Sequence, residues 1–369
     1  MLSQQDAGCL DSYLRTLPLF TTLGETKVWV EAAHRLKQRY KKFLICGLGG
    51  SILTAQALFP LISQGNTVMI LDSIDPLTLY RLQQQDLSDT GIIFISKSGS
   101  TSEILCQVQA LQPQEAVVIT ENKSSPLFNI AQENGWTIIP HPSDIGGRFS
   151  AFTAVGCLPC MLMGLDPMKF IKGAKDAIQN REAFDGQVLF DAYQAGHKLH
   201  VLWGYSDYLN GLLLWCCQLI AESLGKKDVY QQPFGFQPII NKGPLDQHSQ
   251  LQLYLDGPHK YIFTLLRVNC DTIPLPRKHN IVPDPSMMLY QEHAPHDFLK
   301  AHFENTKSVL QEAGHYVREI VLPDLSEEAF GFVMMRFILE TLSLAHLANV
   351  NPFDQPAVEA SKQFMERFL

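Results

Sequence analysis

Five short apolar runs, each followed by a pattern typical of a helix, occupy residues 43 to 140 of this 369-residue chain. The runs cover residues 43–47, 67–71, 91–96, 116–120 and 136–139. They are apolar on both faces, as strands of a parallel sheet are when helices cover both of its sides. The alternation predicts a doubly wound α/β domain, which binds its ligands at the carboxyl ends of its strands.

A second group of strand-like runs follows at wider spacing, over residues 198–204, 261–266 and 316–322. The chain is longer than one core usually supports, so two domains are expected. We predict an N-terminal helical segment, a first and a second domain, and a C-terminal helical segment with an apolar helix at its start. These predicted parts cover residues 1–39, 40–180, 181–330 and 331–369.

Charge and hydropathy disfavour nucleic-acid and membrane partners. The net charge is −8, from 29 basic and 37 acidic residues, and no Lys/Arg block is long enough for a nucleic-acid tract. No apolar stretch reaches the roughly 20 residues of a membrane span, and residues 1–10 lack the pattern of a secretion signal. We therefore expect a cytoplasmic protein.

The eight cysteines indicate free thiols rather than a metal site. Cys157 and Cys160 have the spacing of a ligand pair, but no second pair completes a four-thiolate site. Others, among them Cys46, Cys106 and Cys216, lie in apolar runs, which predicts buried free thiols in a reducing compartment.

The loop at residues 96–101 directly follows a strand and precedes a predicted helix. Hydroxyl groups, free backbone amides and the positive end of a helix together suit a phosphate group. A polar turn with an N-cap explains the same residues about as well when they are considered alone. The side chains offered are those of Ser96, Lys97, Ser98, Ser100 and Thr101.

A glycine-rich turn at residues 47–51 occupies the equivalent place after the first strand. It includes Gly50 and Ser51 but lacks the last glycine of a dinucleotide motif and the lysine of a P-loop, so a nucleotide cofactor is disfavoured. Two such turns at neighbouring strand ends suggest a phosphate carried by a small sugar. The pattern looks like that of sugar isomerase domains.

Further motifs carry a specific resemblance. The ordered motifs lie at residues 47–51, 96–101, 146–150 (Gly-Gly-Arg-Phe-Ser), 218–226, 246–250 and 351–362. With these motifs the chain resembles the glucose-6-phosphate isomerase family, in a compact bacterial form, over roughly residues 40 to 365. Asp246 stands where many members have glycine, and the loop at 96–101 is less rich in threonine.

The resemblance implies two sugar-isomerase-type domains and an aldose–ketose isomerase that works without metal or cofactor. It makes Glu222 the base that moves a proton between C2 and C1, with Gln218 one helical turn earlier. It implies further that Arg148 stabilises the enediolate and that His248 opens the sugar ring. Its remaining implied contacts are Lys362, which holds the ring oxygen or orients His248, and Gln355, which touches the substrate.

Each of these residues also has an ordinary structural explanation. Without the resemblance, Glu222 is a helix-end carboxylate paired with Lys226, Arg148 pairs with a carboxylate, and Lys362 is solvated. Three pairs have the spacing of two metal ligands, but no third ligand accompanies them, so chance spacing is the better explanation. Six other histidines are expected in loops or on exposed faces: His197, His200, His259, His293, His296 and His302.

Two further functions stay open. One is a broader phosphosugar isomerase that also accepts mannose 6-phosphate, and the other is a non-catalytic regulator that binds sugar phosphates. Regulators of the second kind normally add a DNA-binding helix-turn-helix, for which residues 1–39 are too short and insufficiently basic. The resemblance also implies a homodimer in which His248 reaches the neighbouring site, and residues 233–244 are suited to form a projecting arm before it.

Overall fold

The computed structural model describes residues 23–63, 65, 67–180, 186–258, 260–269, 284 and 293–358. Its first half forms a five-stranded parallel sheet in the order β2-β1-β3-β4-β5. Each strand lies within one or two residues of an apolar run predicted from the sequence, so this part of the predicted fold is confirmed. The strands are β1 (Lys42–Gly47), β2 (Thr67–Leu71), β3 (Thr90–Ile95), β4 (Val117–Thr120) and β5 (Thr137–Pro140).

Helices cover both faces of this sheet, and the side chains of β1 show why the strands are apolar throughout. Leu44 and Cys46 point into an outer core, and Phe43 and Ile45 point into a central one. The outer core is covered by α4 (Pro76–Gln83), α5 (Ser102–Leu111) and α6 (Pro126–Glu133). The opposite face is covered by α2 (Leu23–Arg39), α3 (Leu53–Leu58) and α7 (Ala154–Leu162).

The second half forms a four-stranded parallel sheet in the order β11-β10-β6-β9. Its strands are β6 (Leu199–Tyr205), β9 (Gln237–Lys242), β10 (Tyr261–Val268) and β11 (Tyr316–Leu322). Its outer face packs on α11 (Leu251–Asp256) and α13 (Pro295–Glu312) through an aromatic cluster that includes Trp203, Tyr254 and Phe303. The predicted class, two parallel sheets flanked by helices, is therefore confirmed.

The strand β9 corrects one expectation. The projecting arm predicted at 233–244 is wrong for residues 237–242, which pair with β6 in register from Leu199↔Gln237 to Gly204↔Lys242. Pro238 made a strand look improbable from the sequence, but proline is excluded only from central strands. It is tolerated here because β9 lies at the sheet edge.

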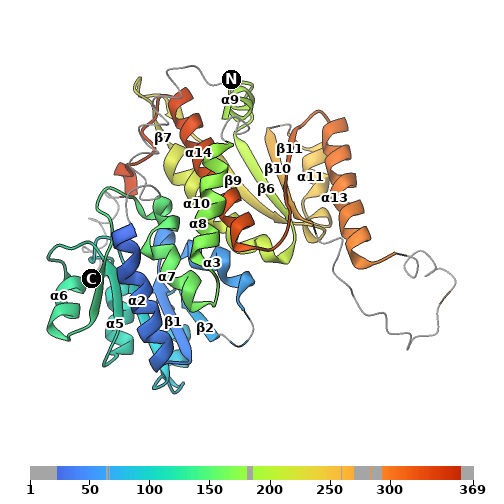
Figure 1. Cartoon of the computed structure of the whole chain (residues 1–369). Helices are drawn as coiled ribbons and strands as arrows, with labels where there is room; N and C mark the ends of the chain where they lie inside the picture. The colour runs from blue at the N-terminus through green and yellow to red at the C-terminus, as the bar shows by residue number, and fades with distance from the viewer. Residues whose placement is uncertain are drawn as a thin grey trace.

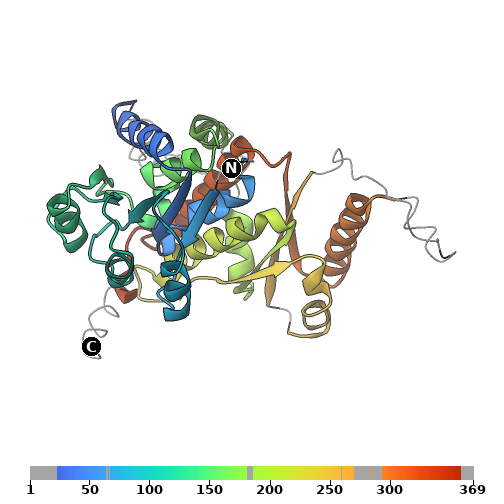
Figure 2. The ribbon, with the colours of Figure 1, turned by 90° about the horizontal axis from the view of Figure 1, so that it is seen from below.

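A layer of helices lies between the two sheets (Figures 1 and 2). Besides α7, it contains α8 (Pro167–Gln179), α10 (Asn210–Leu224) and α14 (Glu327–Leu347), and α9 (Gly186–Gln194) packs against α14. One continuous core draws side chains from these helices and from both sheets, so the two sheets are not independent folding units. The predicted domain limits stay a prediction.

The helices α8 and α14 approach until their backbones touch. A Cβ at Gly173 would lie 1.9 Å from the carbonyl oxygen of Glu328, and a Cβ at Gly331 would lie 1.9 Å from that of Phe170. Glycine is therefore required at both positions. The helix α14 is long and apolar enough to cross a membrane, but 72% of its apolar window is buried inside the fold, as in the core helix of a globular protein.

Two smaller expectations are wrong. His200 is buried rather than exposed, because it lies on the central strand β6 and its Nε2 is 2.7 Å from the Thr264 hydroxyl. Cys106 is exposed on α5, whereas Cys46, Cys157, Cys160 and Cys216 are buried free thiols as predicted.

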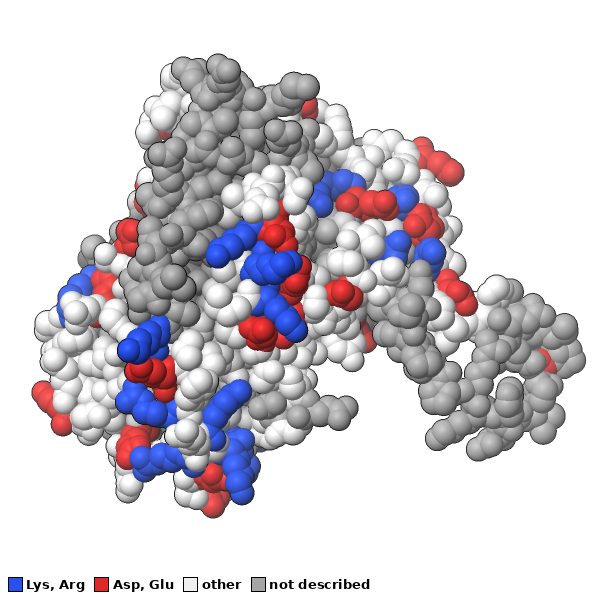
Figure 3. Space-filling model, viewed as in Figure 1, with Lys and Arg blue, Asp and Glu red and all other residues white. Residues whose placement is uncertain are grey.

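On the face seen in Figure 3, basic and acidic side chains are interspersed among uncharged ones.

Candidate active site

The two polar turns meet at one edge of the first sheet. The strands β1 and β3 are neighbours, with Gly47 opposite Ile95, so the turn at 47–51 and the loop at 96–101 begin side by side. The chain leaves β1 toward β2 on one side and returns to β3 on the other. This is the topological switch point at which doubly wound sheets bind ligands.

The loop at 96–101 is held in shape by its own hydrogen bonds. The hydroxyls of Ser96 and Thr101 lie 2.9 Å apart, and the Ser98 hydroxyl accepts bonds from the amide and hydroxyl of Ser100 at 3.2 and 3.1 Å. Gly99 has φ +64°, and a Cβ there would lie 2.1 Å from the Ser125 Oγ. Phosphate binding here stays a prediction, and the prefolded loop with exposed Ser98 and Ser100 suits it.

Lys97 points to other partners than its own loop. Its Nζ donates to the carbonyl oxygen of Ser143 at 2.8 Å and lies 3.6 Å from a carboxylate oxygen of Glu121. Of the five side chains predicted to bind phosphate in the loop at 96–101, Lys97 is therefore already bound to other protein groups.

The glycine-rich turn packs against the segment that carries Arg148. A Cβ at Gly50 would lie 2.2 Å from the carbonyl carbon of Gly147, and a Cβ at Gly49 would lie 2.9 Å from the Gln218 Nε2. Only glycine permits this approach. The turn at residues 49–51 thereby lies beside both the 3-10 helix Gly147–Phe152 and α10.

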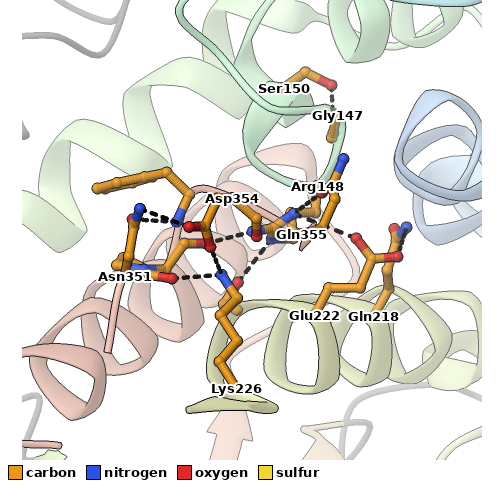
Figure 4. Close-up of polar contacts among 12 residues, drawn as sticks. Gly147, Arg148, Ser150, Gln218, Glu222, Lys226, Asn351, Asp354 and Gln355 are labelled. Atoms are coloured by element: carbon orange, nitrogen blue, oxygen red, sulfur yellow. Dashed lines mark hydrogen bonds and ion pairs between the residues drawn. The ribbon is translucent and has the colours of Figure 1, made fainter. Parts of the chain in front are cut away.

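Arg148 is almost fully buried, and all five N–H donors of its guanidinium have acceptors (Figure 4). The Nε donates to the Ser223 hydroxyl at 2.9 Å. One terminal nitrogen, Nη1, donates to Gln355 Oε1 at 2.5 Å and to Glu222 Oε2 at 3.3 Å. The other, Nη2, donates to the carbonyl oxygens of Pro352 and, at 3.1 Å, Asp354. The bond to Glu222 is the longest of those with a stated length.

Glu222 and Gln218 lie on one face of α10, as their spacing predicts. The Gln218 Nε2 donates to Glu222 Oε1 at 3.0 Å, and the Glu222 side chain keeps 32% of its surface exposed. The pairing of Glu222 with Lys226, the structural alternative, is not what the structure shows. Lys226 instead contacts Asp354 and the carbonyl oxygen of Asn351.

The segment at residues 351–355, which we call the clasp loop, was only partly anticipated. The sequence predicted Gln355 as a contact and Lys226 only as a structural partner of Glu222. It gave no role to Asp354, whose Oδ1 lies 2.9 Å from Lys226 Nζ, or to Asn351, whose Nδ2 donates to Asp354 Oδ2 at 3.0 Å. It also missed Ser223. These four residues belong to the motifs at 218–226 and 351–362. The sequence therefore contained them, but no motif indicated their role in the site.

Two of the predicted catalytic residues are not joined to this cluster in the described part of the chain. His248 is exposed, and its ring forms no hydrogen bond to a described residue. The neighbouring Gln247 anchors its turn to Tyr205 and to the carbonyl oxygen of His302, at 3.0 and 3.1 Å. Lys362 lies outside the described residues.

Asp246, which departs from the family pattern, has a structural role. One carboxylate oxygen accepts from the backbone amide of Lys242 and the other from the Ser249 hydroxyl, both at 2.6 Å. The aspartate thereby ties the turn that carries His248 to the end of β9.

The chain was compared with known proteins. No family model matches the chain. A curated relative, the glucose-6-phosphate isomerase of a Thermus thermophilus strain, is 31% identical over 369 residues, which cover 94% of this chain and 87% of that protein. The chain belongs to the glucose-6-phosphate isomerase family.

Solved structures agree with this family assignment in their fold. A Thermus thermophilus protein described as hypothetical has a TM-score of 0.81 and 29% identity, covering 98% of this chain and 95% of that one. A glucose-6-phosphate isomerase of Chlamydia trachomatis has a TM-score of 0.75 at 18% identity, covering 93% and 72%. The described residues of this isomerase-family chain bring together Gly50, Arg148, Gln218, Glu222 and Gln355.

Proposed function

We propose that this chain interconverts D-glucose 6-phosphate and D-fructose 6-phosphate through an enediol, as a step of glycolysis and gluconeogenesis. The observation that carries the proposal is the partly exposed Glu222 carboxylate, 3.3 Å from the buried Arg148 guanidinium, near the edge where the two polar turns meet. A base beside a fixed cation is what proton transfer between C2 and C1 requires.

The contacts of Arg148 suggest how the charge moves. When Glu222 takes the proton from C2, the negative charge passes from its carboxylate to the enediolate oxygen of the substrate. The bond from Arg148 Nη1 to Glu222, already 3.3 Å long, then weakens because its acceptor has become neutral. The freed donor can turn to the enediolate. The hydroxyl proton on the C2 oxygen then passes to the C1 oxygen, and Glu222 returns its proton to C1, which leaves a carbonyl at C2.

The proposal extends to assembly and location. His248 is exposed on an anchored turn, which supports a homodimer in which it serves the neighbouring site. We propose that it opens the sugar ring there, together with Lys362. Burial raises the pKa of the Cys157 thiol to about 12, and the cysteines of the described segments are unpaired, which supports a reducing compartment such as the cytoplasm.

Glu222→Gln tests the proposed base. The amide keeps the shape of the side chain but cannot accept the proton, so turnover should fall on the order of a hundredfold or more while sugar phosphate still binds. The measurement is deuterium uptake at C2 from heavy water, beside a coupled assay with fructose 6-phosphate and a glucose-6-phosphate dehydrogenase.

Glu312→Gln, on the exposed end of α13, is the matched control and should behave as wild type. Deuterium uptake at the wild-type rate in Glu222→Gln would show that Glu222 is not the base. Wild-type protein that binds sugar phosphates without turning them over would favour the non-catalytic regulator instead.

A further inference from the structure

Two cations that come from different parts of the chain hold the clasp loop (Figure 4). Arg148 donates to the carbonyl oxygens of Pro352 and Asp354. Lys226, just beyond the end of α10, donates to the carbonyl oxygen of Asn351 and to the Asp354 carboxylate. Asp354 is therefore fixed twice, by its backbone and by its side chain.

This double hold determines where Gln355 lies. Gln355 directly follows Asp354, and its Oε1 accepts from Arg148 Nη1 at 2.5 Å. The same nitrogen donates to Glu222. A shift of Asp354 would thus move Gln355, and Gln355 shares one guanidinium nitrogen with the proposed base.

The contacts close into a ring, because Lys226 lies four residues beyond Glu222. The ring runs from Lys226 through Asp354, Gln355 and Arg148 to Glu222. Three links are polar contacts, Asp354 and Gln355 are consecutive residues, and the chain from Glu222 on α10 to Lys226 just beyond it closes the ring. The position of the Lys226 ammonium is therefore coupled to the position of the guanidinium that faces Glu222.

Burial makes Lys226 unlike an ordinary surface lysine. Its side chain is 9% exposed, whereas that of Asp354 is 52% exposed. Burial lowers the pKa of the Lys226 ammonium, the hydrogen bond to Asp354 opposes this, and the nearby Arg148 cation lowers it further. Because Lys226 is buried, its ammonium needs the acceptors that the clasp loop provides. The geometry of the ring gives these contacts a second consequence, at Glu222.

We propose that Lys226 is a positioning residue for proton transfer at Glu222, acting through Asp354 and Gln355 on the Arg148 guanidinium. The inference rests on the proposed isomerase function. It predicts that loss of Lys226 impairs the chemical step more than it impairs the hold on phosphate, because the loop at 96–101 takes no part in the ring.

The test compares Lys226→Met with Lys172→Met. Lys172 lies on α8 and also pairs with two carboxylates, those of Asp176 and Glu328, away from the site. We expect Lys226→Met to lower kcat about tenfold or more, since small misplacements of a catalytic array have large effects on rate. The inhibition constant of inorganic phosphate should stay the same, and Lys172→Met should leave both quantities unchanged.

Two further variants separate positioning from a loss of structure. Lys226→Arg keeps the cation and should recover part of the lost kcat. Asp354→Asn should lower kcat as Lys226→Met does, and the double variant should be no worse than the less active single variant, because both changes break one link. Thermal unfolding verifies that each variant is folded.

The outcomes distinguish this inference from the function on which it rests. Wild-type protein without isomerase activity removes the proposed function itself. Active wild type with an unchanged kcat in Lys226→Met overturns the positioning role alone. An inhibition constant of phosphate that rises in step with the fall in kcat also overturns it, because the whole site would then be disturbed.

Discussion

At the scale of single residues, burial of an ionised group costs free energy unless its donors find acceptors, and Arg148 meets this condition with five of them. Two of the acceptors are backbone carbonyl oxygens, which have no signature in a sequence. The motif at 146–150 could therefore identify Arg148, but it could not show that Arg148 fixes the clasp loop.

Buried histidines give the chain a predictable dependence on pH. His141 is 3% exposed, and burial lowers its pKa from 6.5 to about 4, although its bond to the carbonyl oxygen of Pro142 opposes the shift. Between these two values the unfolded chain binds more protons than the folded one. Stability is therefore complete above pH 6.5 and is lost as the pH falls toward 4, by about 3 kcal/mol from this residue.

Urea denaturation at pH 7, 5.5 and 4.5 measures this effect. His141→Gln should flatten the dependence on pH, because its amide does not titrate. Some dependence should remain from His200, whose pKa burial lowers well below its ordinary value. His302→Gln, an exposed position on α13, is the control. An equal slope in wild type and His141→Gln would contradict the assignment.

At the scale of elements, strands were easier to predict than the contacts between loops. The runs in the first sheet are apolar on both faces, which marks a covered strand wherever it lies in the fold. The edge strand β9 carries Pro238 and has intermediate burial over half of its length, so its pattern is weak. The approach of Gly50 to Gly147 depends on how α7 and α10 pack, which no local pattern contains.

The loop at 96–101 should supply much of the affinity for phosphate. Removal of two hydroxyls in Ser98→Ala/Thr101→Val should raise KM strongly, since each charge-assisted bond contributes about 1.5–3 kcal/mol. Inorganic phosphate should compete with substrate for the wild type and much less for this variant. Thr78→Val/Ser88→Ala, at exposed positions, is the control. Unchanged competition by phosphate in Ser98→Ala/Thr101→Val would mean that phosphate does not bind at the loop.

At the scale of the whole molecule, the proposed dimer is tested by mixing two inactive variants, Glu222→Ala and His248→Ala. If His248 serves the neighbouring subunit, a mixed dimer has one site with both lesions and one intact site. Random exchange makes about half of the dimers mixed, so about a quarter of the wild-type activity should return. Mass measurement must show that subunits have exchanged. Exchange without recovered activity would mean that His248 serves its own chain.

The sequence by itself determined the parallel strands of the first sheet and the family motifs, because side-chain periodicity and short motifs are local properties. It also placed Gln218 and Glu222 on one helical face, since a helix has a fixed repeat. Only the tertiary structure decided that both sheets share one core and that Arg148 and Lys226 both hold the clasp loop. Those contacts join residues up to 207 positions apart, and their distances depend on how the whole chain packs.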